Sequence, residues 1–219
     1  MGASLGAAAW QTCLGQCNHN LETMIDLEND VNASLIFQAA VDELRRADLR
    51  SELDLNQIPA PGKIAQHAIA FAASVSEGSS ADSGDRGTGR FVLLHEDSPQ
   101  EQWGGNFRII CFAKSPLETE IGADEMISDI SWAWLNEALE QRHAEFSLAS
   151  ATVTRVISTG YGALEQQSDH AELEMRASWS PEGATFSSHI EAWQDLICMM
   201  SGYPALPQGI SHIEAKRNR

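Results

Sequence analysis

The sequence predicts an α+β domain: an antiparallel sheet of about four strands built from two β-β-α units, with helices packed mainly on one face and an extra N-terminal helix. Within residues 90–200, strand-like alternation of apolar and polar residues changes twice to helical spacing. Arg90 and Pro116 flank the strands of the first unit at the same separation at which Arg155 and Pro181 flank those of the second. A repeat determines the whole architecture when it is real. An internal repeat and a chance match both remain compatible with these few shared residues.

In each unit two strands precede one helix. We expect strands at 91–95 and 106–113 and a helix at 128–141, then strands at 152–158 and 171–179 and a helix at 186–200. The strand at 171–179 alternates most clearly, with apolar side chains on one face and Glu172, Glu174 and Arg176 on the other. Because both helices must bury an apolar stripe against the sheet, packing them on one face leaves the other face free.

The part of the chain before residue 90 has weaker patterns. Residues 31–50 have the spacing of an amphipathic helix, which we expect at the rim of the sheet or over part of its open face. Residues 52–58 alternate and indicate a short strand or an extended link. The Ala-rich segment 63–75 is compatible with a strand or a helix, and we assign it to a helix. Gly, Ser and Asp dominate residues 77–89, which is typical of a surface loop.

The length of 219 residues suits one domain with extensions. A hydrophobic fraction of 43% and six tryptophans are enough for a sizeable core. We therefore place a single α+β domain at residues 31–204, between a disordered leader at 1–30 and a C-terminal tail at 205–219.

The charge of the chain restricts its partners. A net charge of −17 repels phosphate backbones, so direct nucleic-acid binding is not expected, whereas a basic partner or a cation would be attracted. No segment is apolar enough to span a membrane. The four cysteines show no disulfide spacing, which indicates a reducing compartment. Together these observations predict a cytoplasmic protein.

Two groups of side chains are candidates for chemistry. His95, Glu96 and Asp97 at a strand end are the residue types of a general base or a metal ligand, but a solvated strand end also explains them, and we favour that interpretation. Glu172 and Glu174 share a strand face, where acid–base work and cross-strand ion pairing are both possible, and ion pairing is the commoner case.

Other candidates concern contact surfaces and the core. Trp103 lies beside two glycines in the first hairpin turn, as an exposed contact residue or as one that folds back on the core. Arg108 joins the free sheet face if the strands have that register. His189, one turn from Trp193, is expected to be buried and hydrogen-bonded. Cys13, Cys17 and His19 supply too few ligands for a metal site, so neither a metal nor a cofactor is expected.

Common catalytic motifs are missing from the sequence. It has no phosphate-binding loop, dinucleotide fingerprint, HExxH helix, nucleophile elbow or CxxC pair. An enzyme of a familiar class is therefore not favoured.

Several segments are nevertheless distinctive, above all WAWL at residues 132–135 and RASWSP at residues 176–181, together with Gly89-Arg90, His95 and Trp103. Over roughly residues 35–210 the chain resembles the domain-of-unknown-function 3000 family of high-GC Gram-positive bacteria. The resemblance implies no established activity, cofactor or catalytic residue.

Two functional hypotheses follow. The first is a non-enzymatic protein-interaction or regulatory domain with an unidentified protein partner, based on the missing motifs, the free sheet face and the acidity. The alternative is a small-molecule-binding protein or an unfamiliar enzyme, with a pocket near His95, Trp103 and Arg108.

Overall fold

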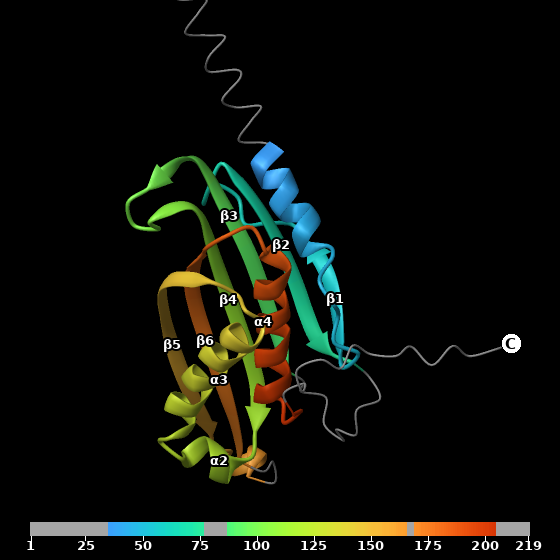
Figure 1. Cartoon of the computed structure of the whole chain (residues 1–219). Coiled ribbons are helices and arrows are strands. Elements are labelled where there is room, and N and C mark those ends of the chain that lie inside the picture. The colour runs from blue at the N-terminus through green and yellow to red at the C-terminus, as the bar shows by residue number, and fades with distance from the viewer. Residues whose placement is uncertain (1–34, 77–86, 166–168, 205–219) are drawn as a thin grey trace, which may run out of the picture.

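A six-stranded antiparallel sheet organises the protein (Figure 1). The computed structural model describes residues 35–76, 87–165 and 169–204, so the predicted leader and tail lie outside the described residues. The strand order is β1-β2-β3-β4-β6-β5. The prediction of about four strands is therefore wrong, because an N-terminal hairpin adds two strands to the four expected ones, although the class remains α+β.

The added hairpin consists of β1 (Leu53–Ile58) and β2 (His67–Val75). The strand expected at residues 52–58 is confirmed, whereas the helix assigned to 63–75 is wrong. In β2, Ile69, Phe71 and Val75 point into the core, and the alternate positions are mostly alanine. Alanine on the outer face concealed the alternation, since it has high helix propensity and little polarity.

The first predicted unit is a longer hairpin, β3 (Thr88–Gln100) and β4 (Gly105–Leu117). Their register is irregular between His95 and Gln100, where the strand bulges before the turn. Gly104 has φ +67°, a left-handed conformation that suits glycine at the turn. The bulge and turn carry Asp97 and Trp103 away from the regular ladder.

The second predicted unit is β5 (Phe146–Ser158) and β6 (His170–Pro181). β4 pairs with β6 from Ile109 opposite Trp179 to Leu117 opposite Ala171, which joins the two units into one sheet. β5 forms one edge of the sheet and β1 the other. A bulge between Ser147 and Ser150 interrupts the start of β5, where Leu148 has φ +52°. The predicted order of strand, strand and helix is confirmed in both halves, and a duplication remains a prediction.

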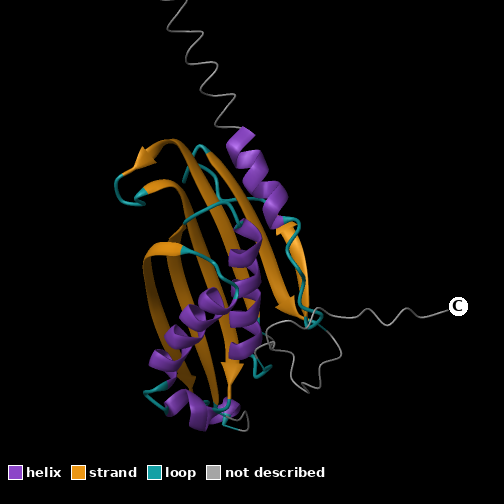
Figure 2. Ribbon diagram, in the orientation of Figure 1, coloured by secondary structure: helices purple, strands orange, loops and turns teal. Residues whose placement is uncertain are grey.

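The helices lie on one face of the sheet (Figure 2). They are α2 (Thr119–Ala123), α3 (Ile127–Gln141), α4 (Phe186–Met200), the short 3-10 turn η1 (Gly162–Leu164) and a helix over residues 35–44. Ala40, Val41 and Leu44 of the last helix belong to the same buried cluster as Trp193, so its apolar stripe joins the core on this face. The expected place over the open face is therefore wrong, whereas the expected place at the rim agrees with Figure 1, in which this helix lies at the β1–β2 edge of the sheet.

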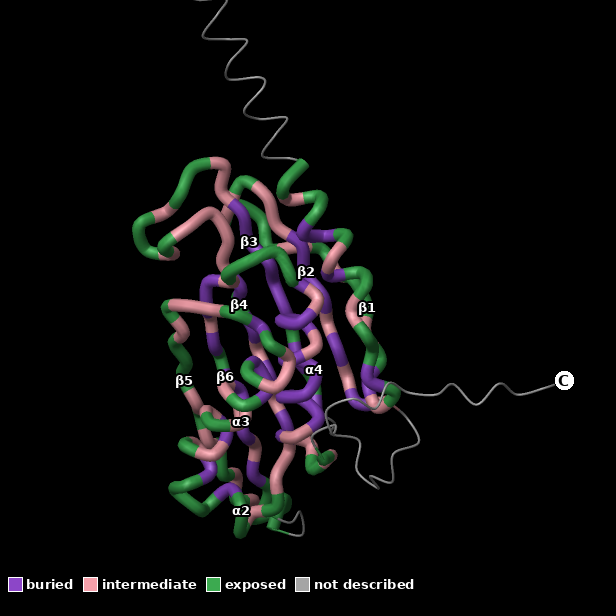
Figure 3. Tube along the Cα trace, viewed as in Figure 1, coloured by how far each residue is buried: buried purple, intermediate pink, exposed green. Residues whose placement is uncertain are grey.

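Trp179 of β6 and Trp193 of α4 are both fully buried, and Figure 3 shows that buried residues concentrate along α4 and the central strands. Trp193 is fully buried and its Nε1–H donates to the Phe112 carbonyl at 3.1 Å. Gly89 makes room for it, since a β-carbon there would lie 2.9 Å from the indole. On α3, where the helical spacing of the sequence favours Trp134 as an inward residue, Trp134 is only partly buried and Leu135 takes the inner position.

Candidate functional site

Three donor side chains meet on the helix-covered face, where β2 begins and β3 bulges. His67 and His95 are cross-strand partners, so their side chains leave the same face of the sheet. Asp97 lies two residues after His95 and returns to that face. The nitrogen and oxygen donor atoms of these three residues lie within 4.8 Å of one another.

The cluster contains one buried atom without a partner. His95 is 2% exposed, and among the described residues its Nδ1 has no hydrogen-bond partner. The nearest acceptor is Asp97 Oδ1 at 3.9 Å, which itself lies 3.2 Å from His67 Nε2. Buried polar atoms are nearly always paired, so this nitrogen requires an explanation. The interpretation of His95 as part of a solvated strand end is wrong.

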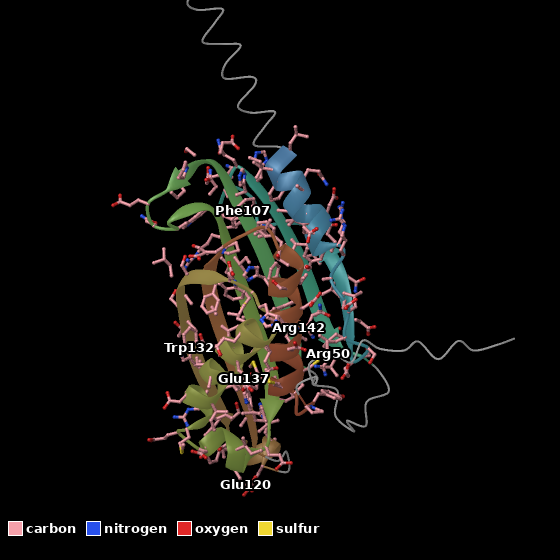
Figure 4. The ribbon with its side chains drawn as sticks, viewed as in Figure 1. Arg50, Phe107, Glu120, Trp132, Glu137 and Arg142 are labelled. Atoms are coloured by element: carbon pink, nitrogen blue, oxygen red, sulfur yellow. The ribbon has the colours of Figure 1, made fainter. Side chains whose placement is uncertain are left out.

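Aromatic rings hold the two imidazoles in place. Phe37, from the helix at residues 35–44, stacks on His67 with ring centroids 5.4 Å apart. Phe107, labelled in Figure 4, contacts His95 at 4.5 Å and Phe186 of α4 at 4.8 Å. Three separate elements thereby fix the orientation of the histidine pair.

Polar contacts shape the bulge that carries Asp97. The side-chain amide of Asn106 donates to the carbonyls of Glu96 and Asp97, at 2.8 and 3.1 Å. The backbone N–H of Asp97 donates to Gln66 Oε1 at 2.7 Å, and the N–H of Gln66 donates to Glu96 Oε1 at 3.3 Å. Bulges often aim a side chain beside a functional site, and these contacts hold Asp97 beside the histidines.

Burial also sets the protonation of His95. Desolvation lowers the pKa of His95, and the neighbouring His67 lowers it further, against the opposing influence of Asp97 and Glu96. The imidazole is therefore neutral at neutral pH and offers a lone pair at one ring nitrogen.

An open cleft of about 760 Å³ adjoins the cluster. His95, Asp97, Trp103 and Asn106 line it, together with Ser180 and residues of the hairpin turn. The predicted neighbourhood of His95 and Trp103 is thus present. Arg108 is not among the lining residues: it lies behind the cleft, donating to Ser180 Oγ at 3.0 Å and Ser178 Oγ at 2.7 Å.

The opposite face of the sheet carries the other predicted residues. Glu174 pairs with Arg176 at 2.7 Å, and Glu172 pairs with Lys114 at 2.7 Å. The pair of Glu172 with Lys114 of β4 is a cross-strand ion pair of the expected kind, whereas Glu174 pairs along its own strand. Arg108 is on this face as well, because it is opposite Leu94 in the ladder, one position out of phase with the inward Ile109.

A groove of about 750 Å³ runs across this open face. Its centre is one row of the sheet in which Ala72, Arg90, Phe112 and Arg176 are successive cross-strand partners. The Arg176 guanidinium lies 5.8 Å from the Phe112 ring centroid. Among the described residues, the side chain of Arg90 forms no hydrogen bond or ion pair, although it is exposed.

Two further charged or polar groups belong to the core. His189 is buried and accepts a hydrogen bond from Trp179 Nε1 at 3.1 Å, so the expected buried histidine is confirmed. Arg50 and Arg142 both donate to Asp195 of α4, at 2.9 and 2.7 Å (Figure 4 labels both arginines). This Arg50–Asp195–Arg142 network joins the N-terminal segment, the end of α3 and α4.

Comparison with known proteins gives one match. The family model described as "Protein of unknown function (DUF3000)" matches residues 33–211. The chain belongs to this family. No curated protein and no solved structure matches it.

Membership in DUF3000 assigns no activity to the residues above. Within the described part of this DUF3000 protein, none of the helices is long and apolar enough to cross a membrane. Sequence reasoning missed His67, Arg90 and Phe112 as site residues of this DUF3000 chain. They can be recognised only from the pairing of β2 with β3 and of β3 with β4, because each forms a site together with a residue on a neighbouring strand.

Proposed function

We propose that this DUF3000 protein is a non-enzymatic binding domain that docks a segment of a partner protein in the groove on the open face of its sheet. The observation that carries the proposal is the row across the groove, in which Arg90, whose side chain has no partner among the described residues, adjoins Phe112 and Arg176. Arginine beside a partly exposed aromatic ring is typical of recognition surfaces.

The floor of the groove is apolar. Ile110 is 40% exposed and lies beside the half-buried Phe112, while Ala72 and Ser74 of β2 are too small to fill the space above their strand. An apolar side chain placed there would remove water from Ile110 and Phe112, which stabilises a complex by about 25 cal/mol per Å² of apolar surface buried. Such a floor suits a side chain of an incoming peptide.

The charges of the groove specify the partner segment. The open face carries the cations Arg90, Arg108, Lys114 and Arg176 against the carboxylates Asp54, Glu172 and Glu174, in a chain of net charge −17. Cations are therefore concentrated on this face. A guanidinium binds a carboxylate through two parallel hydrogen bonds. The segment we propose carries an Asp or Glu opposite Arg90 and an apolar residue over Phe112.

Site-specific crosslinking tests the proposal. A photoreactive amino acid replaces Ile110 in the groove, or Ala133 as a control, which is exposed on α3 on the other side of the sheet. We expect a defined adduct in the native host from position 110 and not from position 133. We expect Arg90→Glu to abolish the adduct at position 110. The matched charge reversal Arg45→Glu should leave this adduct intact.

Mass spectrometry of the adduct then identifies the crosslinked segment. A peptide with an acidic residue next to the crosslink, bound at least tenfold more weakly by the Arg90→Glu protein, supports the proposal. A basic segment, an adduct that survives Arg90→Glu, or no adduct at position 110 overturns it.

A further inference from the structure

The helix-covered face of the sheet carries a cluster of possible metal ligands that is separate from the proposed docking groove. His67, His95 and Asp97 present two imidazoles and one carboxylate to a common point beside the cleft. The geometry points to a binding site for one divalent transition-metal ion, with these three side chains as its protein ligands.

The distances fit a metal of this class. Zinc binds imidazole nitrogen and carboxylate oxygen at about 2.0–2.2 Å, so tetrahedral ligand atoms lie about 3.4 Å apart. Here His67 Nε2 is 3.2 Å and His95 Nδ1 is 3.9 Å from Asp97 Oδ1. Small side-chain rotations bring all three donors to bonding distance, since no pair is more than 4.8 Å apart.

The unpartnered nitrogen is the independent observation. Among the buried side-chain nitrogen and oxygen atoms of the described residues, only His95 Nδ1 has no hydrogen-bond partner. This atom belongs to the same three-residue cluster, and a side chain that is 2% exposed has little access to solvent water as a substitute partner. A metal ion at the centre of the cluster would satisfy the lone pair.

The surroundings resemble the supporting shell of a metal site. Ligands of functional metals are held in place by further hydrogen bonds and packing. Gln66 and Asn106 fix the backbone on either side of Asp97, and Phe37 and Phe107 pack against the imidazoles. The ligand positions are therefore set by the fold before an ion arrives.

The donor set also selects the kind of ion. Imidazole nitrogen suits Zn²⁺, Fe²⁺, Ni²⁺ and Co²⁺, whereas Mg²⁺ and Ca²⁺ prefer sites made of oxygen alone. Three protein ligands leave a fourth position, and His95 and Asp97 both line the cleft. Trp103 and Asn106 line the same cleft, so a small anionic or carbonyl-bearing molecule bound there would be in place to complete the coordination.

Metal titration of the full-length protein tests the inference. The protein is treated with chelator, and Zn²⁺ is titrated in competition with a chromogenic chelator at pH 7.5. The background variant carries Cys13→Ser and Cys17→Ser, so that no thiolate of the N-terminal segment binds the ion. We expect one equivalent to bind at micromolar affinity or tighter, and 1 mM Mg²⁺ not to displace it.

Matched variants assign the ligands. His67→Ala and Asp97→Asn, at partly exposed positions, should each weaken Zn²⁺ binding at least 50-fold while leaving the far-ultraviolet circular dichroism unchanged. His170→Ala and Asp129→Asn make the same changes at exposed sites elsewhere and should leave the affinity unaltered. With Co²⁺ as probe, visible d–d bands should appear in the background protein and be lost in Asp97→Asn.

Two results would overturn the assignment. One is the absence of stoichiometric Zn²⁺ binding in the background that carries Cys13→Ser and Cys17→Ser. The other is an affinity that His67→Ala and Asp97→Asn leave within a factor of three. Neither result bears on the docking groove, which lies on the other face of the sheet and is tested by crosslinking at position 110.

Discussion

Replacement of Asp195 by Asn tests how far one buried carboxylate holds three parts of the fold together. Asp195 accepts hydrogen bonds from Arg50 Nη1 at 2.9 Å and from Arg142 Nε at 2.7 Å and Nη2 at 3.2 Å. Arg50 is 2% exposed, so its charge depends on these partners. Asn has the same size as Asp, so the substitution removes charge without opening a cavity.

The expected loss of unfolding free energy depends on the carboxylate that each arginine retains. Removing one partner of a buried ion pair costs about 3–5 kcal/mol of unfolding free energy. Arg50 retains Glu52, and Arg142 retains Glu191, which places the expected loss near the lower end, at about 3 kcal/mol. The matched change Glu191→Gln removes the charge of a partly exposed carboxylate that pairs with Arg142, while its Oε1 can still accept from the Asp48 N–H, and should cost less than about 1 kcal/mol.

Urea unfolding at pH 7.5, followed by tryptophan fluorescence, measures both variants. With a denaturant slope of about 2 kcal/mol per molar, Asp195→Asn should lower the urea midpoint by about 1.5 M. Half-molar NaCl should change this difference little, because buried pairs are weakly screened. A midpoint that falls by less than about 0.5 M, or an equal fall in Glu191→Gln, would refute the reasoning.

Three further predictions concern the core, the pH dependence and the open face. Trp193→Ala should lower the unfolding free energy by about 3–5 kcal/mol in the same urea assay, and Trp134→Ala, at a partly buried position, by less than half as much. Burial lowers the pKa of His189 to about 4, so its neutral form stabilises the fold fully above about pH 6.5, and that stabilisation of about 3 kcal/mol is lost as the pH falls towards 4. His189→Gln, which can still accept from Trp179, should unfold with a shallower dependence on pH over this range; curves of equal slope would contradict the assignment. Glu172→Lys combined with Glu174→Lys removes two carboxylates from the open face, so it should strengthen the complex with the acidic segment found by crosslinking while changing the melting temperature by only a few degrees; a weaker complex would contradict an acidic partner.

The parts of the fold predicted from the sequence are those with a strong local pattern. The last helix, α4, has the predicted bounds and inward side chains, because Phe186, Ile190, Trp193 and Ile197 repeat at helical spacing on one stripe. The alternation of apolar and polar residues along β6 likewise predicts a strand at the position where the structure has one. In both segments, the burial imposed by the core and the local pattern agree.

The errors occur where the tertiary context decides. In α3, Trp134 and Leu135 are adjacent apolar residues, and only the packing against α4 and β5 selects Leu135 for the inside. In β2, alanines on the outer face produced a pattern that suits a helix equally well. That wrong assignment also hid His67, since a helix at 63–75 gave no reason to place it opposite His95.

The same contrast between local sequence pattern and tertiary context applies to the candidate site. The sequence predicts a pocket near His95, Trp103 and Arg108; His95 and Trp103 do line one cleft, whereas Arg108 lies on the other face. Alternation along β4 settles this, because Phe107 points towards His95 and the next residue must point away. The register between β3 and β4 was needed to apply that rule.

The strand order has a consequence for how the chain folds. Four of the five strand pairings join strands that follow each other in sequence or are linked by a short connection: β1 with β2, β2 with β3, β3 with β4, and β5 with β6. The pairing of β4 with β6 is the distant one, and it brings Ile109 beside Trp179. Closing that loop costs entropy before its contacts form, so this step should limit the folding rate. Substitutions along the β4–β6 seam would then slow folding, whereas substitutions in the β1–β2 hairpin would mainly speed unfolding.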